Sequence, residues 1–222
     1  MKSAMRHNIF KEIKTTFSRF MAIFAIVALG VGFFAGLKAT TPDMKATTDR
    51  YFDDNNLMDI RLLSTMGFTE EDAATLKMQP GIKDVMPTYN CDVLIESSSG
   101  ISVARIHALP QEGSKYDNIN VPVLVEGRLP QNAGECAIDK KMVSSSFGQV
   151  GSTITLSDQN SQDTMDLLNS HEFTVTGIVD SPYYISFQRG TASIGNGNIS
   201  CFMIVPEEDF SSDYYLELFA TV

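Results

Sequence analysis

The most prominent feature of the hydrophobic pattern is an uncharged run of eighteen residues, FMAIFAIVALGVGFFAGL, at Phe20–Leu37. Arg19 and Lys38 bound this run. A helix of this length extends about 27 Å, which is close to the roughly 30 Å hydrocarbon thickness of a bilayer. We therefore predict one transmembrane α-helix over residues 20–37. A cleaved secretory signal is the alternative, but the run exceeds the usual apolar region of about 7–15 residues and no convincing A-x-A site follows it.

The leader over residues 1–19 is basic, because it holds five Lys and Arg residues and a single acidic residue, Glu12. Positive charge close to a membrane span stays on the cytoplasmic side. The whole chain has a formal charge of −10, so the part after the leader carries −14. These charges predict a cell-membrane protein with a cytoplasmic N-terminus and with the bulk of its chain outside the cell.

Apolar residues recur at a helical spacing within the leader, at Ile9, Phe10, Ile13 and Phe17, with lysines between them. This spacing predicts an amphipathic helix that lies on the inner leaflet of the lipid bilayer, with its lysines near anionic headgroups. The alternative is an ordinary basic flank that only sets the topology of the span.

Small residues recur every four positions inside the predicted span, at Ala28, Gly32 and Gly36. They share one side of the helix, and small residues at this spacing let a second transmembrane helix approach closely. We predict a helix-packing face here. The alternative is that glycine and alanine are simply common in membrane spans.

A stalk helix is predicted over residues 38–57. Thr41-Pro42 has the form of a helix start, with threonine as the cap and proline at the first helical position. This helix is expected to end near Asn55 and to continue the span outward.

Residues 58–222 show the pattern of an α+β domain with mixed or antiparallel sheets and few helices. Thr69–Asp72 resembles a capping box that opens a helix to about Gln79, where Pro80-Gly81 ends it. Alternating apolar segments bounded by turn residues predict strands. These strands are Met58–Thr65, Val85–Glu96, Ile101–Leu109, Val121–Glu126, Ser152–Ser157, Glu172–Val179 and Ile199–Val205. The strand-like run Tyr214–Val222 has no polar tail, so the fold is expected to be incomplete at residue 222.

Composition and motifs argue against several function classes. An acidic outer part lacks the basic face that nucleic-acid binding requires. Cys91, Cys136 and Cys201 are far apart in the sequence and are predicted to be unpaired buried thiols. His107 and His171 have no second ligand at metal-binding spacing. No nucleophile elbow, SxxK, HExxH or Walker A sequence occurs, so we predict no catalytic site, cofactor or metal.

Three stretches resemble the permease subunits of ABC transporters of the FtsX-like and MacB-like kind, especially the large ones of low-GC Gram-positive bacteria. The first is FKEIKTTFSRFMAIFAIVALGVGFFAGLKATTPDM at Phe10–Met44, which is similar to the family's surface helix, first transmembrane helix and stalk. The second is VEGRLPQNAGECAIDKKM at Val125–Met142, followed by VGSTITL at Val150–Leu156. The third is FTVTGIVDSPYYISFQRGTASIGNGNISCFMIVPEEDF at Phe173–Phe210.

This resemblance implies a MacB-like extracellular core domain over residues 58–222. It also implies a separate cytoplasmic ABC ATPase subunit that dimerises on ATP, shifts the stalk helices and so changes the relation of the extracellular domains. The family has three further spans and a second half. The resemblance therefore implies a fragment or a truncated product, with further permease segments or a second permease copy as partners.

The hypothesis is a permease subunit, not itself an enzyme, that couples ATP hydrolysis to movement of its extracellular domain for export or signalling. Gly127 and Arg128 are predicted to form a tight turn that sets the geometry of the core, and a binding role for Arg128 is the alternative. The rival hypothesis for the chain is a single-span, membrane-anchored extracellular sensor or binding module that works without an ATPase.

Overall fold

The computed structural model describes residues 5, 11, 15–97, 100–111, 114–116, 118–143 and 148–222. The chain divides into two compact units, residues 1–51 and residues 52–222. Each unit is described by itself. The predicted membrane-surface residues Ile9, Phe10 and Ile13 lie outside the described residues.

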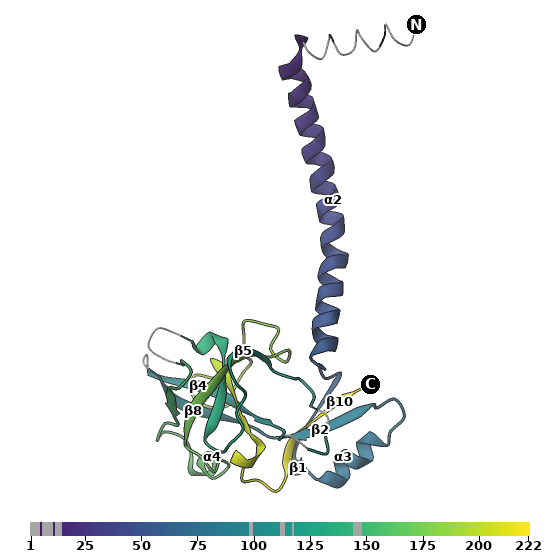
Figure 1. Ribbon diagram of the computed structural model, residues 1–222. Coiled ribbons are helices and arrows are strands. Elements are labelled where there is room, and N and C mark those ends of the chain that lie inside the picture. Colours follow the sequence, from purple (N-terminus) through teal and green to yellow (C-terminus); the bar gives the residue numbers. More distant parts are fainter. Residues whose placement is uncertain are drawn as a thin grey trace. The chain divides into compact units, whose positions relative to one another are not determined.

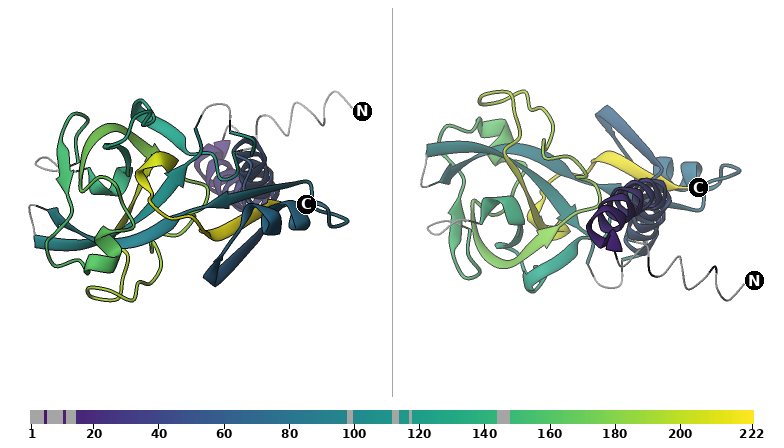
Figure 2. Two further views of the ribbon diagram at one scale, coloured as in Figure 1. Left: turned by 90° about the horizontal axis from the view of Figure 1, so that it is seen from below. Right: turned by 90° about the horizontal axis from the view of Figure 1, so that it is seen from above.

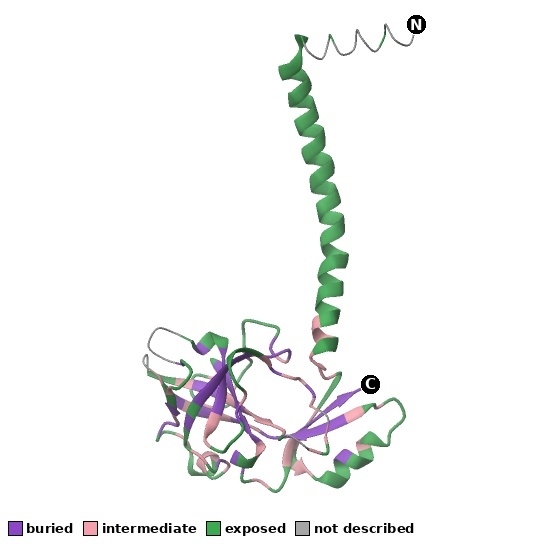
Figure 3. Cartoon of the chain, viewed as in Figure 1, coloured by how far each residue is buried: buried purple, intermediate pink, exposed green. Residues whose placement is uncertain are grey.

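Helix α2 runs without a break from Phe17 to Asp54 (Figure 1), and none of its residues is buried (Figure 3). It is long and apolar enough to cross a membrane. The predicted helix start at Thr41-Pro42 is wrong, because Pro42 lies inside α2. Proline at this position removes one backbone hydrogen bond, while each other residue of a long helix adds one. The predicted span and stalk are therefore parts of one 38-residue helix.

A three-stranded antiparallel sheet contains the first and last strands of the core. Its order is β1 (Ile60–Phe68), β10 (Tyr215–Thr221) and β2 (Asp84–Thr88). Helix α3 (Glu70–Lys77) packs on this sheet, and a small cluster of Ala73, Val85, Leu218 and Ala220 is buried between them. The capping box predicted for α3 is confirmed, since the Thr69 hydroxyl accepts from the Asp72 N–H and the Asp72 carboxylate accepts from the Thr69 N–H.

The larger sheet has seven strands in the order β3-β4-β9-β6-β8-β5, with β7 paired to β8. β4 pairs in parallel with β9, and β6 pairs in parallel with β8, so the sheet is mixed. Its strands are β3 (Asn90–Ser97), β4 (Gly100–Leu109), β5 (Val123–Gly127), β6 (Glu135–Asp139), β7 (Thr153–Thr155), β8 (Glu172–Asp180) and β9 (Cys201–Pro206). The short helices are η1 (Lys140–Met142), α4 (Gln162–Met165) and η2 (Glu207–Asp209). The α+β class is confirmed.

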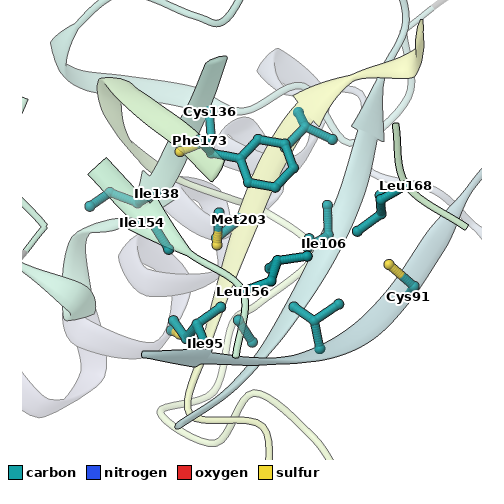
Figure 4. Close-up of a cluster of buried hydrophobic side chains, with 14 of the residues drawn as sticks. Cys91, Ile95, Ile106, Cys136, Ile138, Ile154, Leu156, Leu168, Phe173 and Met203 are labelled. Carbon is teal, nitrogen blue, oxygen red and sulfur yellow. The ribbon is translucent and has the colours of Figure 1, made fainter. Parts of the chain in front are cut away.

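The main hydrophobic core lies within the curved seven-stranded sheet. Figure 4 shows side chains from several of its strands pointing toward one another, among them Phe173 and Met203, which are fully buried. Cys91, Cys136 and Cys201 are all free and buried, as predicted. Burial raises the pKa of the Cys91 thiol to about 12 and that of Cys201 to about 12, so these thiols stay protonated and unreactive.

The sequence pattern joined two strands that the fold separates. Val85–Glu96 was predicted as one strand, but the structure ends β2 at Thr88 and begins β3 at Asn90. Between them, the ring of Tyr89 packs on Phe210 and Tyr215, with centroids 5.3 Å and 4.8 Å away. The chain therefore passes from one sheet to the other, and the two sheets occupy opposite ends of the core (Figure 2).

Candidate functional site at the junction of helix and core

The junction between α2 and the core is a short segment held in place by a second segment, residues 118–121. Asn120 N–H donates to the Asn56 carbonyl at 2.8 Å, and Val121 N–H donates to the Asn55 carbonyl at 2.9 Å. The Asn56 carboxamide donates to the Asn118 carbonyl at 3.0 Å, and the Asn120 carboxamide accepts from the Met58 N–H at 3.0 Å. Four hydrogen bonds thus join the residues that directly follow α2 to a segment about 60 residues later.

Two residues of this junction hold unusual backbone angles. Asn56 has φ +47° and Asn120 has φ +60°, and they are the only residues other than glycine with positive φ in the part of the chain that the structure describes. Asparagine tolerates the left-handed region better than most residues. The two turns therefore depend on residue type as well as on hydrogen bonds.

The junction is also tied to the last strand. Asp59 N–H donates to the Ala220 carbonyl at 2.9 Å, and the Asp59 carboxylate accepts from the Val222 N–H at 2.9 Å. β1 continues from there in antiparallel register with β10, Ile60 opposite Ala220. The start of the core, the 118–121 segment and the end of β10 consequently form one hydrogen-bonded unit.

Charged and aromatic side chains fill the space between the two sheets. Arg61 of β1 forms an ion pair with the buried Glu217 of β10 and lies 5.5 Å from the centre of the Tyr183 ring. The Tyr183 ring is 5.9 Å from that of Phe219. A cavity of about 40 Å³ lies beside these rings, lined in part by Met86 and His107. This contact between the sheets is therefore only partly apolar and leaves a small void.

His107 is neutral in this setting. Its Nε2 is 2.7 Å from the Tyr184 hydroxyl, and its ring lies edge-on to the rings of Tyr183 and Tyr184. Burial, with the positive charges of Arg105 and Arg61, lowers the pKa of His107 to about 3. In the described parts of the chain, no group of three His, Cys, Asp or Glu side chains is placed to hold a metal ion.

Gly127 and Arg128 lie where β5 leaves β8. Gly127 has φ +75°, and a Cβ there would lie 2.3 Å from the Thr176 carbonyl O. Arg128 N–H donates to the same carbonyl at 2.9 Å, and a Cβ at Gly177 would lie 2.3 Å from the Arg128 carbonyl O. The end of β5 and the middle of β8 therefore contact each other through backbone atoms.

The Arg128 side chain makes a bidentate ion pair with Glu135, at 2.8 Å and 2.6 Å. This pair, together with the N–H groups of Gln131 and Asn132, holds the pKa of the Glu135 carboxyl well below its usual range. The alternative role of Arg128, binding, would require a ligand to compete with this carboxylate.

A second ion pair, between Asp139 and Arg189, is almost completely buried, with side-chain exposures of 0% and 5%. Arg189 Nε donates to Asp139 Oδ2 at 2.7 Å and Nη2 donates to Oδ1 at 2.9 Å. The guanidinium also donates to the carbonyls of Tyr184 and Ser186 and lies 5.4 Å from the ring centre of Phe202. This pair fastens the segment after β8 to the end of β6.

The predicted helix-packing residues lie along α2. Gly32 and Gly36 are exposed, and an added Cβ at either would meet no atom within 4 Å. Ala28 is exposed as well, and Phe17, the one described residue of the predicted membrane-surface set, is the first residue of α2. Packing at this face and contact with the inner leaflet stay predictions.

Sequence reasoning missed the residues that form the junction and the buried ion pair. The junction asparagines carry one recognisable signal, since Asn commonly occupies left-handed turns, but their pairing across about 60 residues has no local trace. Asp139 and Arg189 were passed over because charged residues are rarely fully buried.

A profile of the MacB-like periplasmic core domain matches residues 20–218. Among solved structures, the extracellular domain of the noncanonic ABC-type transporter YknZ from Gram-positive bacteria is 16% identical, with a TM-score of 0.44, and the match covers 72% of this chain and 75% of that one. The periplasmic region of MacB from Actinobacillus actinomycetemcomitans is 14% identical, with a TM-score of 0.40, and the match covers 72% of this chain and 66% of that one. A comparison with curated proteins gives no match.

Proposed function

Because this chain belongs to the MacB-like periplasmic core domain family and is an ABC transporter permease-type component, we propose that it couples ATP hydrolysis to movement of its core. In this proposal, a separate cytoplasmic ATPase subunit shifts α2, and the extracellular core follows for export or signalling. The N-terminus lies in the cytoplasm, and the leader rests on the inner leaflet.

The junction at the end of α2 is the observation that carries this proposal. A lever transmits motion only if its end is fixed to the body that it moves. The last turn of α2 leads directly into four hydrogen bonds with the 118–121 segment and into the pairing of β1 with β10. A displacement of the helix end would therefore be passed to both sheets.

Further permease segments or a second permease copy would pack against α2 in this proposal. The face of Ala28, Gly32 and Gly36 supports that contact, because it is open and consists of small residues at helical spacing. Close contact between helices would make the span part of a transmembrane helix bundle. The arrangement of that bundle would depend on the nucleotide bound to the ATPase subunit.

Affinity purification of the full-length membrane product in mild detergent, followed by mass spectrometry, tests the partnership. Recovery of an ABC ATPase in stoichiometric amount is the expected result. Repeated recovery of the protein without any ATPase would favour the alternative function, an anchored extracellular sensor or binding module that works without ATP.

The junction gives a prediction that separates coupling from assembly. Asn120→Gly keeps the left-handed backbone accessible but deletes the carboxamide that accepts from Met58 N–H. We expect the variant to retain its ATPase partner, while the distance between spin labels at Thr47→Cys and Gln162→Cys, which an intact junction would hold nearly constant, changes with nucleotide at least about twofold more than in the unsubstituted chain. The three native thiols are buried and protonated, so labelling is confined to the introduced cysteines.

Asn198→Gly is the matched control, because Asn198 lies in an exposed turn and makes only local hydrogen bonds. In this control, the nucleotide-dependent change in label distance should be the same as in the labelled chain that keeps Asn120. An equal effect of both substitutions would mean that the junction does not transmit motion.

A further inference from the structure

The loop between β8 and β9 presents two large apolar side chains to solvent. Ile185 is 73% exposed and Phe187 is 89% exposed, and only Ser186 separates them. The two residues and Lys141, which lies beside them, are called the loop tip below. Exposed apolar side chains mark an interaction site when they form a contiguous patch, whereas single ones are ordinary.

The loop tip is held by a buried carboxylate. Asp139 accepts two hydrogen bonds from Arg189, whose Nη1 in turn donates to the Ser186 carbonyl at 2.9 Å and to the Tyr184 carbonyl at 3.1 Å. The same carboxylate accepts from the Lys141 N–H at 3.0 Å. One buried group thus positions both the apolar residues and the lysine, so little conformational entropy remains to be lost when the loop tip binds.

Lys141 places a positive charge beside an aromatic ring. Its ammonium group donates to the Phe187 carbonyl and lies 5.8 Å from the centre of the Phe187 ring. Seven of the nine Lys and Arg residues of residues 52–222 pair with a carboxylate, whereas Lys141 forms no ion pair with any described residue. The loop tip is therefore a positively charged, apolar point on an acidic domain.

We propose that the loop tip docks into the headgroup region of the bilayer, with Phe187 and Ile185 at the acyl boundary and Lys141 on lipid phosphate. Aromatic and lysine side chains favour this region of a membrane. The proposal rests on α2 spanning the bilayer. Residues 38–54 of α2, beyond the apolar run, are about 25 Å long as a helix, so a connection of this length tethers the core to the span. The tether supplies a high effective concentration for a contact that two side chains alone would make weakly.

The test uses the absence of tryptophan from the chain, because F187W then carries the only indole. The full 222-residue variant is reconstituted in vesicles of phosphatidylcholine and phosphatidylglycerol, with ordinary or acyl-brominated chains. We expect blue-shifted emission, and quenching by brominated lipid at least about twofold stronger than for M66W. Met66 is 90% exposed on β1 and is the control for an apolar residue without a neighbouring lysine.

Replacing Lys141 by glutamine in the F187W background, or phosphatidylglycerol by phosphatidylcholine, should weaken the quenching. Unshifted emission without quenching would overturn the proposal, and so would equal quenching of F187W and M66W. Blue-shifted emission that brominated lipid does not quench would overturn it in favour of a protein partner. Co-flotation of the chain with vesicles reports the anchoring by α2 separately, and failure to float would overturn the membrane anchoring as well.

Discussion

Asp139→Ala is expected to lower the free energy of unfolding of the core by about 3–5 kcal/mol. The substitution leaves the Arg189 guanidinium 5% exposed and without its carboxylate. It also removes the acceptor for the Lys141 N–H at the start of η1. Desolvation of an unpaired guanidinium is not offset by the remaining carbonyl acceptors. Urea unfolding of the full chain in detergent, followed by tyrosine fluorescence from the seven tyrosines, measures the change.

Two further variants define the cause of that loss. Asp158→Ala removes an exposed carboxylate and should change stability by no more than about 0.5 kcal/mol. The double variant Asp139→Ala with Arg189→Met replaces both charges and should regain much of the lost stability, because the surrounding Tyr184 and Phe202 rings are apolar partners. A loss below about 1 kcal/mol for Asp139→Ala alone would show that the pair is not desolvated.

The elements that were predictable from the sequence are those fixed by local pattern. An uncharged run of eighteen residues predicts a helix long enough to cross a bilayer, and α2 contains this run. α3 was predicted because Thr69 and Asp72 satisfy each other's backbone groups within one turn. Both signals lie within a few residues, so no tertiary information was needed.

The misses share a different cause, which is pairing over long distances. β6 has a buried carboxylate as its last residue, and only the guanidinium fifty residues later makes that burial possible. The break between β2 and β3 arises because Tyr89 packs on rings from the far end of the chain. The prediction at Pro42 failed for a local reason. Pro42 indicated a helix start, but the helix continues past it although proline lacks the backbone N–H donor.

Gly127→Ala is expected to lower the free energy of unfolding by about 3 kcal/mol or more, through two additive effects. The first is backbone strain, because φ is +75° at this position. The second is overlap, because the new Cβ would lie 2.3 Å from the Thr176 carbonyl O and could be accommodated only by moving β5 from β8.

The control variant Gly81→Ala separates the two effects. Gly81 has φ +93° with no atom within 4 Å of an added Cβ, so it should cost only the strain of about 1–2 kcal/mol. Urea unfolding of both variants measures the difference, and equal losses would show that the close approach of Gly127 to Thr176 contributes nothing to the geometry of the core.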